Sequence, residues 1–159
     1  MKTLLISIMM VFAFSVQAQT MAKQSFEDQW EKPVELNEQT QWLVITQSKD
    51  AGKIVKESFE SLELKDLAQL NMLYLADISR MPGFITSMFA IPKMRDYGFQ
   101  VGLMKEDDQL AALKLTSLDS EKVSVVSLKN LEVIDTQLFE DNAAFKAFIQ
   151  SSVVGEQSK

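Results

Sequence analysis

The first place where side-chain types and spacing could do chemistry is a short basic segment around residue 50. Two lysines stand close to a glycine where an apolar run ends and a helical period begins. The N-terminus of such a helix attracts anions through its free N–H groups and its dipole, and lysine side chains add donors. We therefore predict a ligand or partner surface that includes Ser48, Lys49, Asp50, Gly52 and Lys53. The alternative is a solvated turn with no ligand.

Three methionines in a second region could bind a soft metal ion. Met81, Met88 and Met94 fall within one predicted helical region, and thioethers bind Cu(I). A Met-based copper carrier is therefore one hypothesis. The alternative is a packing role, because methionine fills irregular gaps in a core and Met88 lies on the apolar face of the predicted helix.

Charged side chains offer two further hypotheses. Arg95, between Lys93 and Asp96, could clamp a carboxylate, although an exposed helix end with a weak ion pair explains the same cluster. An enzyme that uses carboxylates is the second hypothesis, because the chain has 22 acidic residues. The sequence does not indicate which of them would face one another.

Missing residue types exclude several kinds of chemistry. The chain has no cysteine and no histidine. It therefore lacks the residues of a thiol redox cycle, a cysteine/histidine zinc site, a histidine-ligated haem and a Ser-His-Asp triad. Its five glycines form no dinucleotide or phosphate-loop fingerprint. We predict no cofactor.

The first eighteen residues have the three zones of a secretory signal peptide. Lys2 supplies a positive start, residues 4–14 are apolar except for Ser7, and Val16 and Ala18 place small residues before a cleavage site. The apolar run is too short to remain as a membrane span. We expect residues 1–18 to be removed and the mature protein to be periplasmic, with no membrane insertion afterwards.

The charge of the chain limits its partners. The formal net charge is −6, and the loss of Lys2 makes the mature chain more negative. Such a surface repels phosphate backbones and anionic headgroups, so neither nucleic acid nor a membrane surface is an expected partner. An unknown periplasmic protein or a small anionic ligand is expected instead.

The elements that would position these residues follow from the hydrophobic periods. A hairpin is predicted over residues 25–36, and strands over 42–45, 72–76, 99–104, 122–128 and 131–134. Helices are predicted over 51–63 and 81–96, a short helix or coil around 110–115, and a last helix that begins at an Asp141 cap. Pro92 predicts a kink or restart near residues 90–91.

Strands that alternate with helices indicate a three-layer α/β/α sandwich with a mixed sheet. Residues 19–154 are predicted to form one domain, and residues 155–159 a frayed tail. Strands 42–45 and 72–76 should be buried on both faces. The buried face of the 81–96 helix is predicted to carry Phe84, Ile85, Met88 and Phe89.

This order of elements resembles the thioredoxin-like fold, in the branch with an added N-terminal hairpin that peroxiredoxins and exported thiol-disulfide proteins share. Residues 26–36 are similar to the opening of that branch, with Glu31 where a glycine is usual at the turn. The resemblance breaks at the redox motif. Lys49 and Gly52 stand at the two thiol positions, and Glu121 stands at the position of a cis-proline that faces them.

A closer resemblance is to a group of small exported proteobacterial proteins with no assigned activity. It is carried by residues 74–83 and 89–97 and covers nearly the whole mature chain. The resemblance implies an exported, redox-inactive thioredoxin-like protein that binds a ligand or partner, with Glu121 part of the same candidate surface. The alternatives are an enzyme that uses carboxylates in the same cleft, and the copper carrier.

Overall fold

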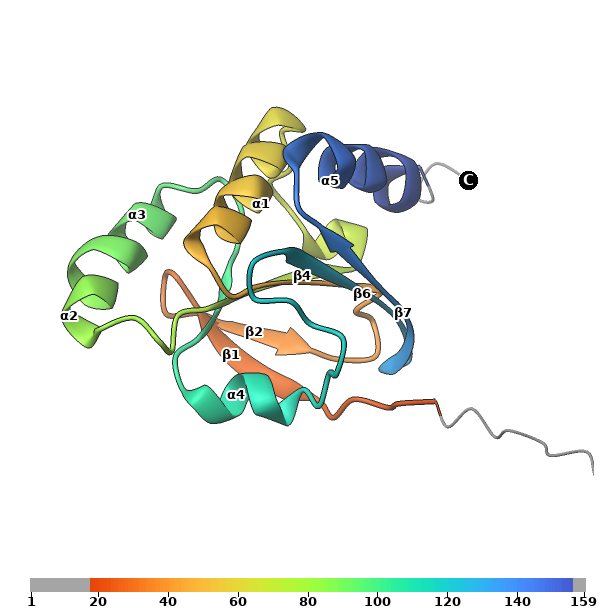
Figure 1. Ribbon diagram of the computed structural model, residues 1–159, viewed down its shortest axis with the longest axis horizontal. Helices are drawn as coiled ribbons and strands as arrows, with labels where there is room; N and C mark the ends of the chain where they lie inside the picture. The colour runs from red at the N-terminus through yellow and green to blue at the C-terminus, as the bar shows by residue number, and fades with distance from the viewer. Residues whose placement is uncertain (1–17, 156–159) are drawn as a thin grey trace, which may run out of the picture.

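The computed structural model describes residues 18–155 (Figure 1). The predicted signal peptide lies outside the described residues except for Ala18, and so do residues 156–159 of the predicted tail. Among the described residues, no helix is both long and apolar enough to cross a bilayer.

A seven-stranded mixed sheet forms the centre of the molecule, in the order β2-β1-β5-β4-β3-β6-β7. The three central strands β5, β4 and β3 are parallel, and every other neighbouring pair is antiparallel. The strands are β1 (Gln24–Asp28), β2 (Pro33–Leu36), β3 (Trp42–Thr46), β4 (Met72–Asp77), β5 (Gly102–Met104), β6 (Val123–Lys129) and β7 (Glu132–Phe139). The predicted N-terminal hairpin is thus confirmed and extends one edge of the sheet.

Helices cover both faces of this sheet, as the predicted sandwich requires. Figure 1 shows α1 and α5 side by side on one face and α4 on the other. The helices are α1 (Lys49–Ser61), α4 (Asp107–Ala112) and α5 (Asn142–Phe148), which continues as a π-helical turn, η3 (Ile149–Val154). A 3-10 turn, η1 (Ala68–Leu70), precedes β4. The loop at residues 113–118 completes the cover on the α4 face.

The core consists of two apolar layers, one on each face of the sheet. Leu43 and Leu73 face the α4 side, and Val44 and Tyr74 face the α1 side, all of them buried. β3 and β4 are therefore buried on both faces, as predicted. On the α1 side, Phe59 packs against several other aromatic rings, at centroid distances of 5.1 to 6.0 Å.

A continuous helix over residues 83–95 consists of three parts: α2 (Gly83–Ile85), the π-helical η2 (Thr86–Ala90) and α3 (Ile91–Arg95). The π-helical turn lies immediately before Pro92, and the Ile91 N–H bonds to the Thr86 carbonyl five residues back. Pro92 has no N–H to donate, so the irregularity expected near residues 90–91 takes this form.

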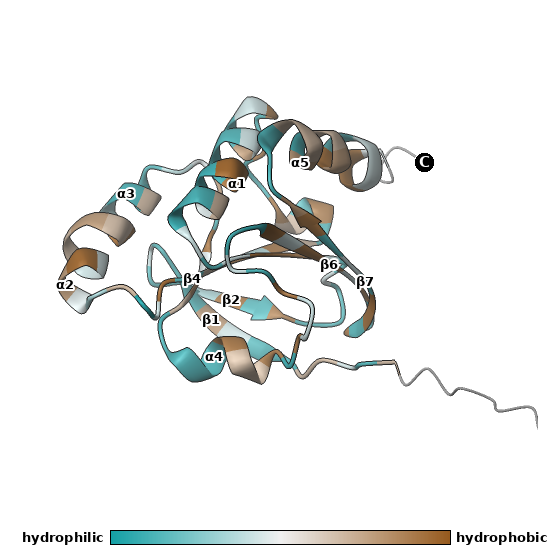
Figure 2. Cartoon of the chain, in the orientation of Figure 1, coloured by the Kyte–Doolittle hydropathy of each residue, from teal (hydrophilic) through white to brown (hydrophobic). Residues whose placement is uncertain are grey.

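The prediction that this helix has a fully buried apolar face is wrong. Phe84, Met88 and Phe89 are 63%, 67% and 61% exposed, and Ile85 is half-buried. The helix lies beyond the ends of the strands (Figure 1), and Figure 2 colours part of it as hydrophobic. Only its C-terminal part reaches the core, because α1 already covers the neighbouring face of the sheet.

Side-chain hydrogen bonds explain where two predicted boundaries differ. α1 begins at Lys49, two residues early, because the Ser48 hydroxyl accepts from the Ala51 N–H and caps the helix. β5 covers only part of the predicted 99–104 strand. The buried amide of Gln29 bonds to the Phe99 carbonyl and the Val101 N–H, where a partner strand would otherwise lie. At the other end of the chain, Asp141 caps α5 as predicted.

Candidate functional site

A cleft of about 540 Å³ lies at the carboxyl ends of β3 and β4, between the start of α1 and the 83–95 helix. Its volume is in the range of small-molecule sites. The lining residues are Thr46, Ser48, Lys49, Gly52, Lys53, Lys56, Glu57, Tyr74, Ala76, Asp77, Ile78, Met81, Ile85, Phe89, Ala90, Lys93, Met94 and Tyr97. In open α/β sheets, ligands bind outside the carboxyl ends of the strands, so the cleft is in a typical position.

Two hydroxyl groups from neighbouring strands form the floor of the cleft. Thr46 Oγ1 and Tyr74 Oη lie 2.9 Å apart and share one hydrogen bond. Burial raises the pKa of Tyr74, so its phenol stays neutral at any physiological pH. The pair has two hydroxyl hydrogens and uses one between them. Among the described residues, the second hydrogen has no other acceptor.

Four lysines give the cleft a positive rim. Lys53 pairs with Glu57 at 3.7 Å, and Lys56 bonds to Glu60 at 2.7 Å. Lys56 also lies 5.5 Å from the centre of the Tyr97 ring. The hydrogen bond to Glu60 raises the pKa of Lys56, and burial raises the pKa of Tyr97. Lys56 is therefore cationic and Tyr97 neutral at physiological pH.

The other two lysines lie on opposite walls of the cleft. Lys49 is in the first turn of α1, and Lys93 is in α3. Neither forms an ion pair with any residue that the structure describes. Both are therefore available to a ligand.

The two carboxylates that line the cleft already have partners. Asp77 accepts hydrogen bonds from the Ser79 N–H and hydroxyl, at 3.0 and 2.6 Å. Glu57 pairs with Lys53 and accepts from the Asn142 amide at 3.2 Å. The lining therefore combines four cations with two partnered anions in a chain whose net charge is −6.

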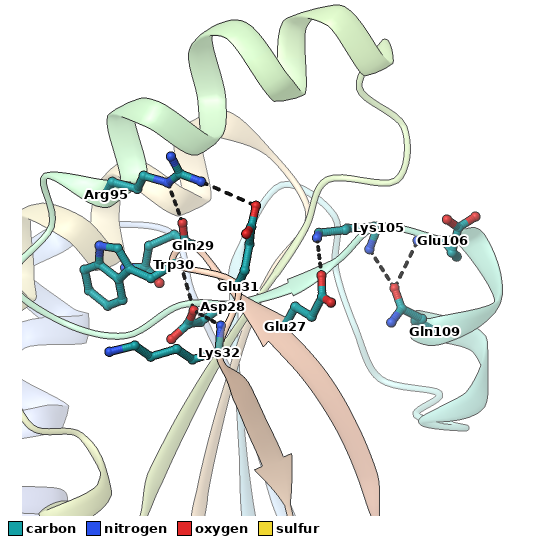
Figure 3. Close-up of polar contacts among 10 residues, drawn as sticks. All are labelled: Glu27, Asp28, Gln29, Trp30, Glu31, Lys32, Arg95, Lys105, Glu106 and Gln109. Carbon is teal, nitrogen blue, oxygen red and sulfur yellow. Dashed lines mark hydrogen bonds and ion pairs between the residues drawn. The ribbon is translucent and has the colours of Figure 1, made fainter.

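The apolar wall of the cleft is formed by Ile85, Phe89, Ala90 and Met94 of the 83–95 helix, together with Met81 just before it. The 83–95 helix lies along this wall. Its C-terminal end is fixed to the hairpin turn. Arg95 Nε donates to the Gln29 carbonyl at 2.8 Å, its guanidinium lies 3.7 Å from Glu31, and the Gln29 amide donates to the Met94 carbonyl at 3.3 Å. Figure 3 shows Arg95 reaching down to Gln29 and Glu31 of the turn.

The turn that anchors this wall is itself held by a buried carboxylate. Asp28 accepts from the Trp30 and Lys32 N–H groups, both at 2.8 Å, and from the Gln100 amide at 2.7 Å (Figure 3 shows the backbone pair). Glu31 completes the turn with a φ of 63°, in the left-handed region that favours glycine.

Four of the six residues predicted for the candidate surface line this cleft. They are Ser48, Lys49, Gly52 and Lys53, whereas Asp50 and Glu121 are not among the lining residues. The Glu121 side chain contacts Ser120 in the exposed loop before β6. Ser48 already occupies the Ala51 N–H that an anion at the helix N-terminus would use. An anion placed at this end would therefore depend more on lysine side chains than on free backbone groups.

The other predicted clusters are divided between different environments. Lys93 lines the cleft, whereas Arg95 bonds to the hairpin turn. Met81 and Met94 line the cleft, but Met88 is exposed and lies outside it, so its predicted place in the core is wrong. The described residues contain no group of three or more Asp or Glu side chains arranged to hold a metal ion.

Sequence reasoning missed Lys56 and the Thr46–Tyr74 hydroxyl pair. A signal for Lys56 existed, since residues 49, 53 and 56 are spaced by four and three and therefore share one face of a helix. No sequence signal pairs Thr46 with Tyr74. They meet only because β3 and β4 are parallel neighbours, with Val44 opposite Tyr74 and Thr46 opposite Ala76.

The sequence matches no protein-family model and no curated protein. Solved structures are similar in fold. A peroxidoxin, BcpB, from Mycobacterium tuberculosis has a TM-score of 0.52 and 13% identity, covering 89% of this chain and 96% of that one. A SCO1/SenC family lipoprotein from Bacillus anthracis has a TM-score of 0.55 and 8% identity, covering 91% and 99%.

A thiol:disulfide interchange protein from a Bacteroides species has a TM-score of 0.53 and 10% identity, covering 87% of this chain and 90% of that one. The chain therefore has a thioredoxin-like fold, as its sequence predicted. It has no cysteine, so it lacks the residues of a thiol-disulfide cycle. The described residues also contain no cis peptide bond.

Proposed function

We propose that this protein is an exported, redox-inactive thioredoxin-like protein of proteobacterial type that binds a small anionic ligand in the cleft between α1 and the 83–95 helix. The observation that carries the proposal is the cleft itself. Its volume of about 540 Å³, its mostly apolar lining and its few convergent polar groups are typical of a ligand site. In the thioredoxin-like proteins that the sequence resembles, two thiols stand at the positions of Lys49 and Gly52. We infer that a binding site here takes the place of their redox site.

A binding role is favoured over an enzyme by the state of the two carboxylates. An enzyme of this kind would need a carboxylate that is free to exchange a proton with a substrate. Asp77 and Glu57 are instead held by Ser79, Lys53 and Asn142. Copper carriage has less support, because only two of the three methionines line the cleft.

Export is supported by the three-zone pattern of residues 1–18. Expression of the full chain in a bacterium, followed by periplasmic extraction and N-terminal sequencing, tests it. We expect a periplasmic protein that begins at Gln19. Retention of the uncleaved chain in the cytoplasm would refute export.

Redox inactivity is tested by an insulin-reduction assay on the same material. The assay should show no turnover, and measurable turnover would refute redox inactivity.

Ligand binding is tested by an NMR titration of the ¹⁵N-labelled protein with sulfate, succinate, decanoate and decyltrimethylammonium. We expect at least one anion to shift amides concentrated on residues 46–53 and 76–94. Gly52→Leu should abolish these shifts, because a Cβ at Gly52 would lie 3.7 Å from Tyr74 Oη and the rest of the side chain would extend into the cleft. If no anion in the panel shifts these amides, the proposed function is wrong.

A further inference from the structure

Two properties of the cleft narrow the chemistry of its ligand. The first is charge, because two lysines without ion pairs in the described chain line the cleft, Lys49 from α1 and Lys93 from α3. The second is an apolar wall that no other part of the described structure covers. Phe89 lines the cleft and is nevertheless 61% exposed, and Ile85 beside it is only half-buried.

We propose that the cleft binds an amphipathic carboxylate, in which an apolar chain ends in a single anionic group. The proposal rests on the proposed function and names the class of ligand for the same site. The carboxylate lies at the first turns of α1, near Lys49 and the hydroxyl pair on the floor. The apolar chain lies along the 83–95 helix.

The position of the carboxylate follows from Gly52. A Cβ at this residue would meet Tyr74 Oη at 3.7 Å and Thr46 Oγ1 at 3.9 Å. The hydroxyl pair therefore lies directly beneath the glycine, and the missing side chain leaves an opening above it. The second hydroxyl hydrogen of the pair donates to the carboxylate through this opening, and Lys49 and Lys53 supply charge from the same end of α1.

The position of the apolar chain follows from the opposite wall. Met81, Ile85, Phe89 and Met94 present carbon and sulfur atoms to the cleft. A small polar dianion such as sulfate satisfies the lysines but leaves this wall in water. An apolar chain covers this wall, and the burial of apolar surface favours binding. The flexible methionine side chains can adjust to apolar chains of different shape.

The charge of the cleft selects against other amphiphiles. A cationic amphiphile gains the same apolar contact but meets Lys49 and Lys93, which have no ion pair in the described chain, whereas both carboxylates on the lining already have partners. An anionic membrane surface is a separate possibility, because Phe84 and Met88 are also exposed on this helix. It is disfavoured by the net charge of −6.

The test compares monomeric decanoate with acetate and sulfate, which have charge without a chain, and with decyltrimethylammonium, which has the chain with the opposite charge. Isothermal titration gives affinities, and ¹⁵N NMR gives the position. We expect decanoate to shift residues 46–53 and 81–94 and to bind at least about tenfold tighter than the other three probes. Vesicles of anionic phosphatidylglycerol should not co-sediment with the protein.

Two matched pairs of variants separate the two halves of the site. Lys49→Gln with Lys93→Gln should weaken decanoate binding about tenfold, whereas Lys65→Gln with Lys129→Gln removes the same charge elsewhere and should leave it unchanged. Phe89→Ser should weaken decanoate but not sulfate. Its control is Phe84→Ser, because Phe84 is equally exposed and does not line the cleft.

The outcomes distinguish this inference from the proposed function. If sulfate or succinate shifts the cleft amides while decanoate does not, the amphipathic ligand is wrong and anion binding stands. If no probe shifts these amides, both are wrong. Three further results would each refute the inference, because each indicates non-specific apolar contact. They are equal binding of decanoate and decyltrimethylammonium, equal effects of Phe84→Ser and Phe89→Ser, and vesicle binding without decanoate binding.

Discussion

The two helices that flank the cleft bury very different amounts of their apolar surface. α1 buries Ala51, Val55 and Phe59 completely against the sheet and α5. The 83–95 helix has no fully buried residue, and Phe84 and Phe89 are more than 60% exposed. Both helices carry an apolar stripe, but only one has a sheet face to cover. A helix beyond the strand ends keeps its apolar side chains available for another molecule.

The attachment of the two helices also differs. α1 is held by aromatic packing around Phe59, at centroid distances near 5 to 6 Å. The 83–95 helix is attached at its C-terminal end, where Met94 and Arg95 bond to Gln29 of the hairpin turn. One wall of the cleft is therefore part of the core, whereas the other reaches the core only through Ile91 and Met94 and is otherwise held by polar contacts to a turn. Local unfolding should begin in the second wall.

The largest effect is expected from a charge placed in the core. Val44 is completely buried between α1 and the sheet, so Val44→Asp leaves an unpaired carboxylate in the core. The free energy of unfolding should fall by several kcal/mol, which is comparable with the whole stability of a small domain. We expect no folded protein by circular dichroism. The control is Met88→Asp on the 83–95 helix, which is 67% exposed and should melt as the wild type does. A large destabilisation by Met88→Asp would contradict the difference between the two helices.

The next largest effect concerns the polar anchor of the 83–95 helix. Gln29→Ala removes a buried amide that bonds to the carbonyls of Phe99 and Met94 and to the Val101 N–H. It leaves buried partners unsatisfied, and we expect a loss of about 3 kcal/mol in the free energy of unfolding by urea denaturation. Gln137→Ala, on the exposed face of β7, is the control and should have little effect.

Hydrogen exchange sharpens this result. In Gln29→Ala, the amides of residues 90–101 should exchange faster relative to those of α1 than they do in the wild type. A uniform increase over both helices would show that the anchor supports the whole fold and not this wall in particular.

A smaller effect, dependent on pH, is expected at Asp28. Burial alone would raise its pKa, but hydrogen bonds from Gln100 and from the N–H groups of Lys32 and Trp30 outweigh burial and hold the pKa below its ordinary value of 3.8. The ionised group therefore contributes stability that is fully present above pH 3.8 and is lost as the pH falls through the folded-state pKa. Asp28→Asn should cost about 1–2 kcal/mol at pH 7.

Urea denaturation between pH 2 and pH 7 measures this dependence. The difference between Asp28→Asn and the wild type should shrink below pH 4, because the wild-type carboxyl becomes protonated there. Asp66→Asn changes the charge at an exposed carboxylate and is the control. A difference that stays constant down to pH 2 would show that the carboxylate charge is not what holds the turn.

Periodicity was sufficient to predict most of the fold. The hydrophobic period of residues 51–63 predicted the helix α1, and the unbroken apolar runs at residues 42–45 and 72–76 predicted strands buried on both faces. Periodicity failed at Phe84 and Met88 for a physical reason. An apolar stripe shows that a helix can bury one face. It does not show whether the sheet extends far enough for that face to pack against it.

The candidate site was predicted less completely because it depends on contacts between distant residues. Lys49 and Lys53 could be found beside the start of a helix, but their partner across the cleft, Lys93, is about forty residues away in sequence. The anchoring role of Gln29 is equally non-local, since its partners lie at positions 94 to 101. No local spacing rule applies to such pairs.

The smallest effect is expected at the anchoring turn itself, where Glu31 has a positive φ. Its φ of 63° is strained for any residue with a Cβ. Glu31→Gly relieves the strain but loses an exposed 3.7 Å contact with Arg95, which contributes little, and it adds entropy to the unfolded chain. We expect a net gain of about 0.5 kcal/mol in the free energy of unfolding.

Glu31→Ala provides the matched control, because it removes the same carboxylate but keeps the Cβ. If backbone strain decides the outcome, Glu31→Gly should be more stable than Glu31→Ala in urea denaturation, and Glu31→Ala should be no more stable than the wild type. If both variants lose the same stability, the contact with Arg95 matters more than the backbone. The polar anchor of the 83–95 helix would then extend to Glu31, because a 3.7 Å surface contact would be stabilising this wall of the cleft.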